Sequence, residues 1–333
     1  MIKAYAVMKA GGKLEPFEYD PGELDDHDVE IAVDYCGICH SDLSMINNEW
    51  GMTRYPFVPG HEVAGRISAV GKHVKSFKQG DRVGLGWHSG YCNECNTCME
   101  GDHNLCASAQ GTIIGRHGGF ADKVRAQAAS VVALPDNISS ETAGPLFCGG
   151  VTVYNPLVQF DVKPTAKVAV IGIGGLGHMA LKFLNAWGCE VTAFTSSESK
   201  VAQALELGAH KTLSSTDPEA LNNAGYCFDL IISTVNVGLD WNAYIGTLKA
   251  KGRLHFVGAV IEPVKINILS MMSAQRSISS SPVGSPAVMA EMLEFAARHN
   301  IEAKVETFDM VDVNDAVDRL ENGSPRFRVV LKA

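Results

Sequence analysis

Residues 167–178 read Lys167-Val-Ala-Val-Ile171, Gly172-Ile-Gly174-Gly175-Leu176-Gly177-His178, and this stretch decides the fold of the second half of the chain. Its first residues are mainly apolar, as in a short strand that is buried on both faces of a parallel sheet. Glycines at 172, 174 and 177 follow with the spacing G-x-G-x-x-G, and an apolar stretch to about Trp187 predicts the next helix. A strand, a glycine turn and a helix in this order are typical of a βαβ unit that binds a dinucleotide.

Each glycine of this turn has a separate expected task. Gly172 permits the tight turn, Gly174 lets the backbone approach a pyrophosphate, and Gly177 lets the helix pack closely on the sheet. The positive end of the helix then faces the phosphates, which we expect to lie along Gly172, Gly174, Gly175, Leu176 and Gly177. The alternative is a turn that only packs, because glycine turns are common.

The end of the next predicted strand, residues 190–194, indicates which dinucleotide binds. An NAD-preferring site has Asp or Glu at this strand end, about 20 residues past the first glycine, to accept hydrogen bonds from the ribose hydroxyls. This chain instead has Thr195, Ser196, Ser197 and, slightly later, Lys200. Three hydroxyls and an ammonium favour a 2′-phosphate, and therefore NADPH. Two alternatives remain: Glu198 turns back toward the ribose, or a serine of this group caps the following helix.

Strand and helix patterns continue to alternate after this unit, which predicts a doubly wound parallel sheet. The predicted elements are a helix at 198–207, strands at 228–232 and 253–257, helices at 286–298 and 313–321, and a last strand at 327–331. Before residue 150 the pattern differs, because short strands are broken by glycine and proline. Val29, Ile31 and Val33 alternate with other residues, which predicts a half-buried strand. The first half therefore indicates an irregular β domain.

One short polar segment carries Cys92, Cys95, Cys98 and Cys106. Four thiolates surround a tetrahedral Zn²⁺ completely, which is the composition of a structural zinc site. An iron–sulfur cluster is the rival interpretation, because cysteines at this close spacing also hold such clusters. The distance to the fourth cysteine and the absence of a proline after it favour zinc.

A second set of metal-binding side chains comes from two separate motifs. Cys39 in Cys39-His-Ser-Asp42 supplies a soft thiolate, and His61 in Gly60-His-Glu62 supplies an imidazole. The fold must bring them together, and a third ligand would leave one position open for substrate. This is the composition of a catalytic zinc site. From the residues alone, Cys148 is interpreted only as a buried thiol beside two glycines.

Composition narrows the possible partners. The chain of 333 residues is 46% hydrophobic and 20% charged, as in an ordinary globular protein with room for two domains. Its net charge of −9 and the absence of a basic block argue against a nucleic acid or an anionic membrane and favour a small substrate. No export signal or membrane-spanning stretch is evident, so we expect a cytoplasmic protein. Nine cysteines then indicate metal ligands and buried thiols rather than disulfides.

Several motifs taken together resemble one family. They are Tyr35–Asp42, Tyr55–Glu62, Gly80–Val83, the four-cysteine segment, Gly144–Tyr154 and Gly172–His178. Over its whole length the chain resembles the zinc-dependent medium-chain alcohol dehydrogenases, and within them the NADPH-dependent aldehyde reductases of the cinnamyl alcohol dehydrogenase group. The resemblance implies an α/β protein with a GroES-like irregular β catalytic domain, residues 1–150 and 284–333, and a Rossmann doubly wound parallel-sheet domain, residues 151–283, that binds NADP(H).

The resemblance also implies how a catalytic zinc is held. Cys39, His61 and Cys148 would be its ligands, and this zinc would be one of two in each chain. Asp42 would orient His61 through the other ring nitrogen, and Glu62 would be a carboxylate that approaches the metal during ligand exchange. A plain loop charge is the alternative for Glu62.

A proton relay is implied beside these ligands. Ser41 would hydrogen-bond the substrate oxygen and pass a proton toward the nicotinamide ribose, while His40 would contact the pyrophosphate. Many family members complete the relay with a histidine five residues after the first cysteine ligand, whereas this chain has Ser44 there. The last group of the proton path is therefore left open.

Further contacts with the coenzyme follow from the resemblance. Thr152 would pack near the nicotinamide, and Arg328 would reach the pyrophosphate, with a structural salt bridge as the equal alternative for Arg328. The positions expected on the nicotinamide side are Ser233, Thr234, Val235, Val257 and Gly258.

The expected substrate channel is largely apolar. By resemblance its lining includes Trp50, Met52, Trp87 and His88, with a core or interface position as the alternative for each. An apolar channel favours an aromatic aldehyde such as cinnamaldehyde or benzaldehyde, or a long aliphatic aldehyde. We therefore expect reversible reduction of such aldehydes to primary alcohols by hydride transfer from NADPH.

Other functions remain open at this point. A zinc polyol dehydrogenase would call for a polar channel and a carboxylate at the strand end, and a zinc-free quinone reductase normally lacks the four-cysteine segment. A non-catalytic binding protein of the same fold would be indicated by a missing zinc ligand. Relatives assemble as dimers and tetramers, so we expect a homo-oligomer, more readily a dimer than a tetramer.

Overall fold

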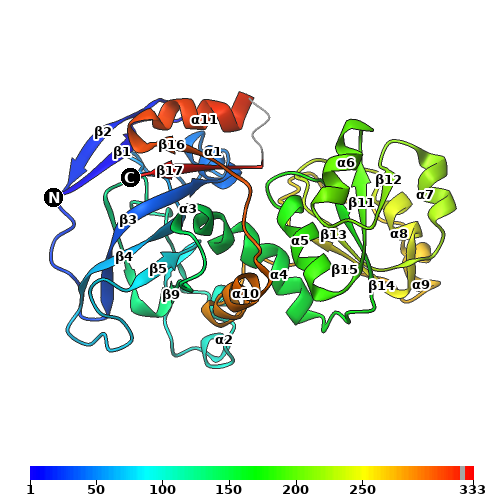
Figure 1. The fold of residues 1–333 in the computed structure, drawn as a ribbon, viewed down its shortest axis with the longest axis horizontal. Helices are drawn as coiled ribbons and strands as arrows, with labels where there is room; N and C mark the ends of the chain where they lie inside the picture. Colours follow the sequence, from blue (N-terminus) through cyan, green and yellow to red (C-terminus); the bar gives the residue numbers. More distant parts are fainter. Residues whose placement is uncertain (323–326) are drawn as a thin grey trace. The chain divides into compact units, whose positions relative to one another are not determined.

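The computed structural model describes residues 1–322 and 327–333. They form two compact units, of which one combines residues 1–151 with residues 283–333 and the other contains residues 152–282. Each unit has its own main β-sheet (Figure 1). Each also has its own buried apolar cluster. The first unit is therefore built from both ends of the chain.

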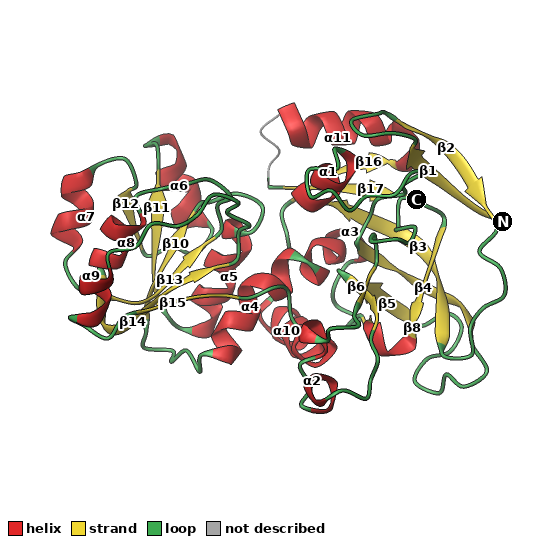
Figure 2. Cartoon of the chain, turned by 180° about the vertical axis from the view of Figure 1, so that it is seen from behind, coloured by secondary structure: helices red, strands yellow, loops and turns green. Residues whose placement is uncertain are grey.

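The unit of residues 152–282 is built on a six-stranded sheet whose neighbouring strands are all parallel (Figure 2). Its spatial order is β12-β11-β10-β13-β14-β15. The order reverses between β10 and β13, which is the topological switch point of the Rossmann fold, and this confirms the predicted Rossmann sheet. The strands are β10 (Lys167–Ile171), β11 (Glu190–Thr195), β12 (Lys211–Ser214), β13 (Phe228–Ser233), β14 (Leu248–Phe256) and β15 (Ser277–Ser280).

Burial on both faces explains why the central strands are so apolar. Ala169, Ile231 and Leu254 come from three neighbouring strands and are fully buried. The helices that connect or precede the strands are α4 (Gly149–Gln159), α5 (Gly177–Trp187), α6 (Ser199–Glu206), α7 (Pro218–Ala224), α8 (Trp241–Gly246) and α9 (Ile268–Met272). The predicted helices at 177–187 and 198–207 therefore match α5 and α6 closely.

In this unit, two strands and several short helices were not predicted. β12 and β15 form the two edges of the sheet, and their residues are only partly buried or exposed. β15 reads Ser-Ile-Ser-Ser and so lacks the apolar run of a central strand. An edge strand needs less apolar surface because one side has no neighbour, which removes the pattern that identified the other strands.

The other unit contains a seven-stranded sheet with the order β16-β17-β3-β4-β5-β9, in which β8 also pairs with β3. The last strand, predicted at 327–331, is β17 and lies antiparallel to β3, so the end of the chain completes a sheet begun near its start. The strands are β3 (Asp28–Ile38), β4 (Glu62–Val70), β5 (Arg82–Leu85), β8 (Lys123–Gln127), β9 (Val131–Ala133), β16 (Val305–Asp309) and β17 (Arg328–Lys332).

Smaller elements surround this sheet. Two-stranded sheets join β1 (Ile2–Val7) to β2 (Leu14–Tyr19) and β6 (His88–Gly90) to β7 (Gln110–Gly111). The helices predicted near the end of the chain are α10 (Pro286–His299) and α11 (Val313–Asn322). Short helices α1 (His40–Ile46), α2 (Asn96–Met99) and α3 (Ser140–Ala143) and the 3-10 turn η3 (Gly144–Phe147) precede or follow the predicted metal ligands.

One side chain of β3 departs from the predicted alternation. The alternation that predicts this strand places Glu30 on the face opposite Val29 and Ile31, yet Glu30 is only 8% exposed. Its carboxylate accepts hydrogen bonds from Lys123 Nζ at 2.8 Å, Arg125 Nε at 3.0 Å and Ser68 Oγ at 3.1 Å. Two-residue periodicity describes apolar burial and cannot reveal a charge that is buried because its partners on β4 and β8 neutralise it.

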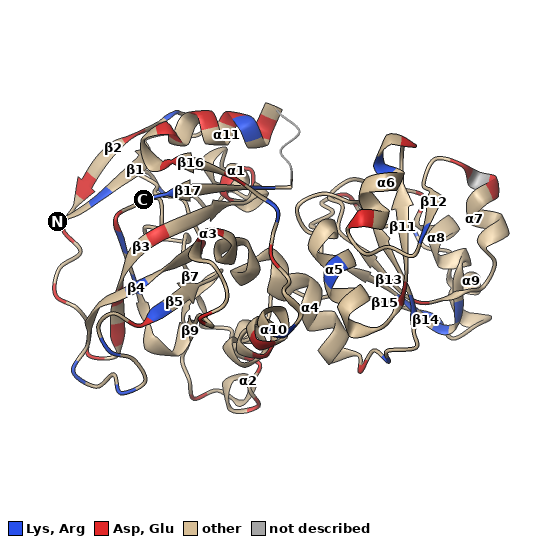
Figure 3. Cartoon of the chain, viewed as in Figure 1, with Lys and Arg blue, Asp and Glu red and all other residues tan. Residues whose placement is uncertain are grey.

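Charges are distributed over both units with the two signs interspersed (Figure 3). Within the described residues, no helix has both the length and the apolar character needed to cross a membrane.

Candidate metal and dinucleotide sites

The cysteines of the four-cysteine segment lie together around α2. The Sγ atoms of Cys92, Cys95, Cys98 and Cys106 are all within 4.8 Å of one another. Cys92 Sγ lies 3.9 Å from Cys98 Sγ and 3.5 Å from Cys106 Sγ, and Cys95 Sγ lies 3.9 Å from Cys106 Sγ. All are free thiols rather than disulfides.

These separations suit a single tetrahedral ion. Zn–S bonds of about 2.3 Å place the sulfurs of a tetrahedral site about 3.8 Å apart, which is close to the spacing found here. A cluster of several irons needs a wider opening between the sulfurs. The residues present therefore fit one zinc ion with no open position.

A second cluster joins residues from three separate parts of the chain. Cys39 immediately precedes α1, His61 precedes β4, and Cys148 lies between η3 and α4. Together with Glu62, their potential ligand atoms lie within 4.8 Å of one another. His61 and Glu62 are fully buried and Cys39 is 6% exposed, whereas Cys148 is partly exposed.

Asp42 holds two of these side chains in place. Its Oδ1 lies 3.1 Å from His61 Nδ1 and accepts from the Gly60 N–H at 2.9 Å, while its Oδ2 accepts from the Cys39 N–H at 2.9 Å. With its proton on Nδ1, the imidazole directs the Nε2 lone pair toward Cys148 Sγ, 3.3 Å away. This is the arrangement in which a carboxylate orients a histidine ligand.

Glu62 is buried with an incomplete set of partners. One carboxylate oxygen pairs with the Arg328 guanidinium, and the other, Oε2, has no hydrogen-bond partner. Gly37 makes room for it, since a Cβ there would lie 2.1 Å from Oε2. An unpaired buried carboxylate oxygen beside two thiols and an imidazole is a donor set that fits a divalent cation.

Arg328 was expected either to reach the coenzyme pyrophosphate or to form a structural salt bridge. Its side chain is 5% exposed and its charge is already matched by Glu62, so the structure shows the salt-bridge alternative rather than an arginine presented to a pyrophosphate. β17 returns beside β3 and places Arg328 under the metal-binding residues. Only the tertiary fold brings residue 328 to residue 62.

The two thiols of this cluster differ in their affinity for a proton. A hydrogen bond with Cys148 lowers the pKa of Cys39 well below its ordinary value, against the opposing effect of burial. The same hydrogen bond, together with burial, raises the pKa of Cys148 well above its ordinary value. Without a cation, therefore, one thiol is set up to ionise and the other keeps its proton. A divalent cation would allow both to be thiolates.

The polar residues after Cys39 lie on α1. Ser41 Oγ lies 3.8 Å from Cys39 Sγ, and His40 is exposed at the start of the helix. Ser44, which stands where many relatives have a histidine, donates to Glu49 Oε2 at 2.7 Å. Glu49 was not among the predicted residues, because no sequence pattern relates it to Ser44 before the end of α1 is placed.

Two of the expected channel residues lie beside the metal-binding cluster. The Trp87 ring contacts the His61 ring with centroids 5.0 Å apart, and Trp50 contacts Trp87 at 6.1 Å. Met52 is 45% exposed. His88 instead packs on Tyr91 at 5.5 Å, and Tyr91 belongs to the small cluster of the four-cysteine segment. The structure thus forms an aromatic wall from Trp50 and Trp87 next to His61.

The glycine turn lies where the carboxyl end of β10 meets α5, beside the switch point. Gly172 has a left-handed φ of 86°, and a Cβ on Gly177 would lie 1.8 Å from the Gly172 carbonyl oxygen. The packing of the protein itself therefore requires both glycines. A Cβ on Gly174 would meet no atom within 4 Å, so protein packing gives no reason for this glycine. An approaching ligand would supply that reason.

Neighbouring turns complete this edge of the sheet. Thr234 Oγ1 donates to the carbonyls of Ile171 and Gly172 at 3.0 and 2.8 Å, which fixes the first turn to the end of β13. A Cβ on Gly258 would lie 2.2 Å from the Val235 carbonyl oxygen, so the turns after β13 and β14 touch. Val257 is partly buried. The Ser233 side chain is fully buried, so only its backbone is available at this edge.

The residues after β11 are arranged as follows. Thr195 is 5% exposed, and Ser196, Ser197 and Lys200 are exposed. Helix α6 begins after Glu198, and neither Glu198 nor a serine caps it with its side chain. The capping alternative for Ser196 and Ser197 is therefore wrong, since Ser197 Oγ interacts with Ser199 Oγ instead. Thr152 is buried on α4.

Two family profiles match this chain, and together they cover parts of both units. The profile described as "Alcohol dehydrogenase GroES-like domain" matches residues 25–136, and the profile described as "Zinc-binding dehydrogenase" matches residues 175–298. The aldehyde reductase AdhA of Synechocystis sp. is 60% identical over 99% of this chain and 98% of its own length. The chain belongs to the zinc-dependent medium-chain alcohol dehydrogenases.

Other relatives of this alcohol dehydrogenase differ in their named substrates. The mannitol dehydrogenase of Petroselinum crispum is 40% identical over 96% of this chain and 97% of its own length. The cinnamyl alcohol dehydrogenase of Helicobacter pylori, solved as a complex with NADP(H), is 32% identical, has a TM-score of 0.91 and covers 99% of this chain and 97% of its own. The family and the oxidoreductase class are thereby shown, as is the resemblance to the cinnamyl alcohol dehydrogenases.

Proposed function

We propose that this alcohol dehydrogenase reduces aldehydes to primary alcohols with NADPH, reversibly, at a zinc held by Cys39, His61 and Cys148. The observation that carries the proposal is the buried set of two thiols and an imidazole beside the unpaired Glu62 oxygen. A zinc bound there would polarise the aldehyde carbonyl so that its carbon accepts a hydride. A second zinc, held by the four cysteines at 92, 95, 98 and 106, would be structural.

The protein groups around the ligands have separate tasks. Asp42 keeps His61 in the tautomer that offers Nε2, and Arg328 balances the charge of Glu62. Ser41 holds a proton on Oγ close to Cys39, where it is available to the substrate oxygen. Ser44 and its partner Glu49 take the place of the missing histidine as the outer end of the proton path, since a carboxylate can accept the proton and exchange it with water.

The preference for NADPH rests on the residues after β11. No carboxylate stands at the strand end, and the exposed Ser196 and Lys200 are available to a 2′-phosphate. Replacing Thr195 by Asp should shift the preference toward NADH, because a carboxylate at the strand end repels the phosphate and accepts from the ribose hydroxyls. The measurement is the ratio of kcat/KM for NADPH to that for NADH. Thr216→Asp, beyond β12, is the control, and an unchanged ratio in Thr195→Asp would contradict the assignment.

An apolar substrate is favoured by the aromatic wall of Trp50 and Trp87 beside His61. The wall supports aromatic and long aliphatic aldehydes, because apolar surface excludes water from the reacting carbonyl. The second candidate is polyol oxidation, which the similarity to a mannitol dehydrogenase favours. A non-catalytic role is disfavoured, since all the expected zinc ligands are present.

The proposal is tested by measuring oxidation of NADPH, with NADH in parallel, in the presence of cinnamaldehyde, benzaldehyde or a long aliphatic aldehyde. The reverse reaction is measured with NADP⁺ and mannitol. We expect turnover of the aldehydes that prefers NADPH, stops on removal of metal and returns with zinc. Turnover of mannitol alone would establish the polyol function instead. No turnover with any substrate in the zinc-loaded protein would leave the binding function.

We also propose that the chain forms a homodimer through the edge of the Rossmann sheet. β15 is an edge strand, and exposed apolar side chains of Ile261, Ile268, Leu269 and Met272 lie in the connection between β14 and β15. An unpaired strand edge next to exposed apolar residues is a surface that a second copy would cover. Sedimentation of Leu269→Lys, which should be monomeric, tests this interface.

A further inference from the structure

A cavity of about 410 Å³ lies on the unit of residues 152–282, and none of the residues proposed above to bind zinc or coenzyme lines it. Its walls are the segment between α4 and β10, residues 160–166, and the first parts of β13 and β14. Parallel strands β10 and β13 begin at this edge, whereas the glycine turn follows the end of β10. The cavity is therefore at the opposite edge of the sheet, about 16 Å away for a strand of this length.

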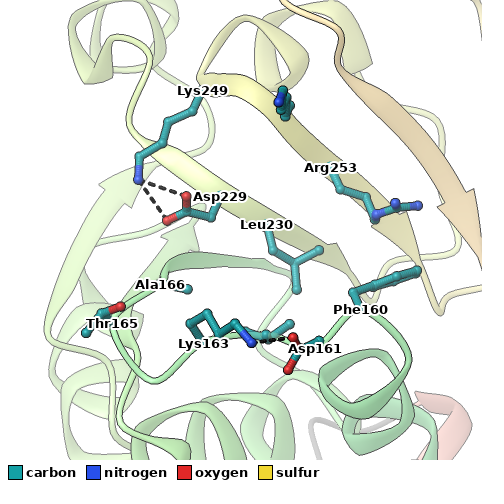
Figure 4. Close-up of a pocket in the computed structure, with 11 residues that line it drawn as sticks. Phe160, Asp161, Lys163, Thr165, Ala166, Asp229, Leu230, Lys249 and Arg253 are labelled. Carbon is teal, nitrogen blue, oxygen red and sulfur yellow. Dashed lines mark hydrogen bonds and ion pairs between the residues drawn. The ribbon is translucent and has the colours of Figure 1, made fainter.

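Positive charge is in excess around the cavity. Four cationic side chains line it, Lys163, Lys249, Lys251 and Arg253, but only the carboxylates of Asp161 and Asp229. Figure 4 shows each carboxylate paired with one lysine, Asp161 with Lys163 and Asp229 with Lys249. Among the described residues, no carboxylate forms an ion pair with Lys251 or Arg253. Two positive charges thus stay uncompensated at a cavity of a protein whose net charge is −9.

The backbone is distorted at the point that supplies two of these cations. Phe228 pairs with Leu248, but Leu230 pairs with Arg253, so β14 bulges between Leu248 and Arg253 and the bulge carries Lys249 and Lys251. Lys251 has a left-handed φ of 64°, held by its N–H bond to the Ala274 carbonyl at 2.7 Å. Lysine adopts this backbone rarely. Bulges re-aim side chains next to binding sites, and here the bulge adds cations to the cavity wall.

Arg253 is fixed in its orientation by an aromatic ring. Its guanidinium carbon lies 4.0 Å from the centroid of Phe160, and Figure 4 shows the two side chains together at one end of the cavity. Stacking orders the guanidinium plane and leaves its N–H donors free for oxygen atoms of a ligand. The cavity therefore combines an ordered arginine, a lysine without an ion pair and an apolar ring.

We propose that this cavity binds a small phosphomonoester at a site separate from the coenzyme. A phosphomonoester carries about −1.5 to −2 charges at neutral pH, which matches the two uncompensated cations, whereas a monocarboxylate would neutralise only one. Arg253 would bind two phosphoryl oxygens with its planar fork, Lys251 would bind a third, and the organic part would lie against Phe160. The volume is in the range of small-molecule sites.

Isothermal titration calorimetry of the zinc-loaded, full-length protein with glucose 6-phosphate tests the site. The protein is first saturated with the nicotinamide coenzyme that it binds, so that the phosphate positions at the glycine turn are filled. We expect one saturable site per chain and no binding of glucose. Lys251→Asn and Arg253→Gln should each weaken binding roughly tenfold, since each removes a charge-assisted hydrogen bond. Asn suits the left-handed backbone, and Lys75→Ala, an exposed lysine of the other unit, should change nothing.

Three outcomes would overturn the proposal: no saturable binding to the wild-type protein, equal affinity in the Lys251→Asn/Arg253→Gln variant, or binding that is lost once coenzyme is present. The last outcome would place the phosphate at the glycine turn. If Arg253→Gln fails to fold, Lys251→Asn decides alone, because Lys251 is exposed on the bulge. None of these results depends on aldehyde turnover, so failure of the proposed phosphate site can be distinguished from failure of the proposed function.

Discussion

Glu62 and Arg328 form a buried ion pair beside Cys39, His61 and Cys148. Burying a charge is costly unless its partners are complete, yet Glu62 Oε2 and Arg328 Nε lack hydrogen-bond partners. Stabilisation of the fold therefore does not by itself explain why this pair is buried. A carboxylate that keeps one oxygen free next to the ligands can approach a bound metal while water and substrate exchange.

Cys148 is the proposed zinc ligand that the residues alone could not assign. Replacing it by Ser should abolish aldehyde reduction and lower the zinc content from two ions per chain to one, because the remaining thiolate and imidazole hold the ion poorly. The loss of zinc affinity should exceed the roughly 10–100-fold that substitutions outside the ligand set cause. Metal analysis and steady-state kinetics measure both effects.

The matched control for this variant is Cys227→Ser, a thiol in the other unit that belongs to neither metal-binding group. It should keep both zinc ions and full turnover. NADPH binding should be nearly unchanged in both variants. Substantial residual turnover in Cys148→Ser would remove this residue from the ligand set.

Among the elements, the turn between β10 and α5 shows which glycines the packing of the protein itself requires. A Cβ on Gly177 would overlap the Gly172 carbonyl, whereas a Cβ on Gly174 would meet nothing. Both residues are part of the same sequence pattern. Protein packing therefore accounts for Gly177, and contact with the coenzyme is the proposed reason for Gly174.

Two alanine variants test this separation. Gly177→Ala should lower the free energy of unfolding by about 1–3 kcal/mol, the cost of overpacking. Gly174→Ala should leave it within about 0.5 kcal/mol, as for a substitution that disturbs no contact, and weaken NADPH binding roughly tenfold or more. Denaturant unfolding and coenzyme titration provide the two readouts. Equal coenzyme affinity in Gly174→Ala and wild type would mean that no phosphate approaches this backbone.

Beyond their backbone pairing, β3, β4 and β8 are also connected through the Glu30 side chain. Burial raises the pKa of its carboxyl group, but the hydrogen bonds from Lys123 and Arg125 outweigh this and hold the pKa below its ordinary value of 4.5. A carboxyl group with a lowered folded-state pKa stabilises the protein above its unfolded-state pKa, and the contribution is lost as the pH falls through the folded-state pKa.

Replacing Glu30 by Gln should therefore lower the free energy of unfolding by about 1–3 kcal/mol near pH 7. The difference from wild type should shrink as the pH falls through the lowered folded-state pKa, because the wild-type carboxylate then also becomes neutral. Urea unfolding at several pH values measures it, with the exposed Glu15→Gln as control. A difference that stays constant with pH would show that the charge of Glu30 is not what joins the strands.

For the whole molecule, the four-cysteine segment is a local structure with little core of its own. Its buried cluster contains only Tyr91, Cys98 and Cys106, with three partly buried neighbours. So small an apolar core contributes little to ordering a loop of this length, and a bound zinc would supply the missing folding free energy.

Cys98→Ser should accordingly lower the thermal unfolding temperature and remove one zinc ion per chain, while the zinc at Cys39, His61 and Cys148 remains. Thermal unfolding and metal analysis are the measurements, and Met99→Ser, an exposed neighbour on α2, is the control. Retention of both zinc ions in Cys98→Ser would contradict the structural site.

The sequence by itself determined the Rossmann unit and the family, and it indicated the four-cysteine group together with Cys39 and His61 of the other metal-binding group. Its apolar strands, glycine spacing and cysteine spacing are local patterns, and local patterns are set by the backbone and by nearest neighbours. This is why β10, α5 and β11 begin and end close to their predicted positions. The edge strands β12 and β15 were not predicted, because partial burial leaves only a weak apolar pattern in their sequences.

Only the tertiary structure decided the contacts between residues far apart in the chain. Glu62 with Arg328, Glu30 with Lys123 and Arg125, and the cavity cations of β14 depend on strand pairing, register and a bulge. Charges buried through distant partners leave no period in the sequence, because their favourable energy comes from groups that only folding brings within a few ångströms. The sequence contains the reactive groups, and the tertiary fold determines which side chains lie close enough to interact with them.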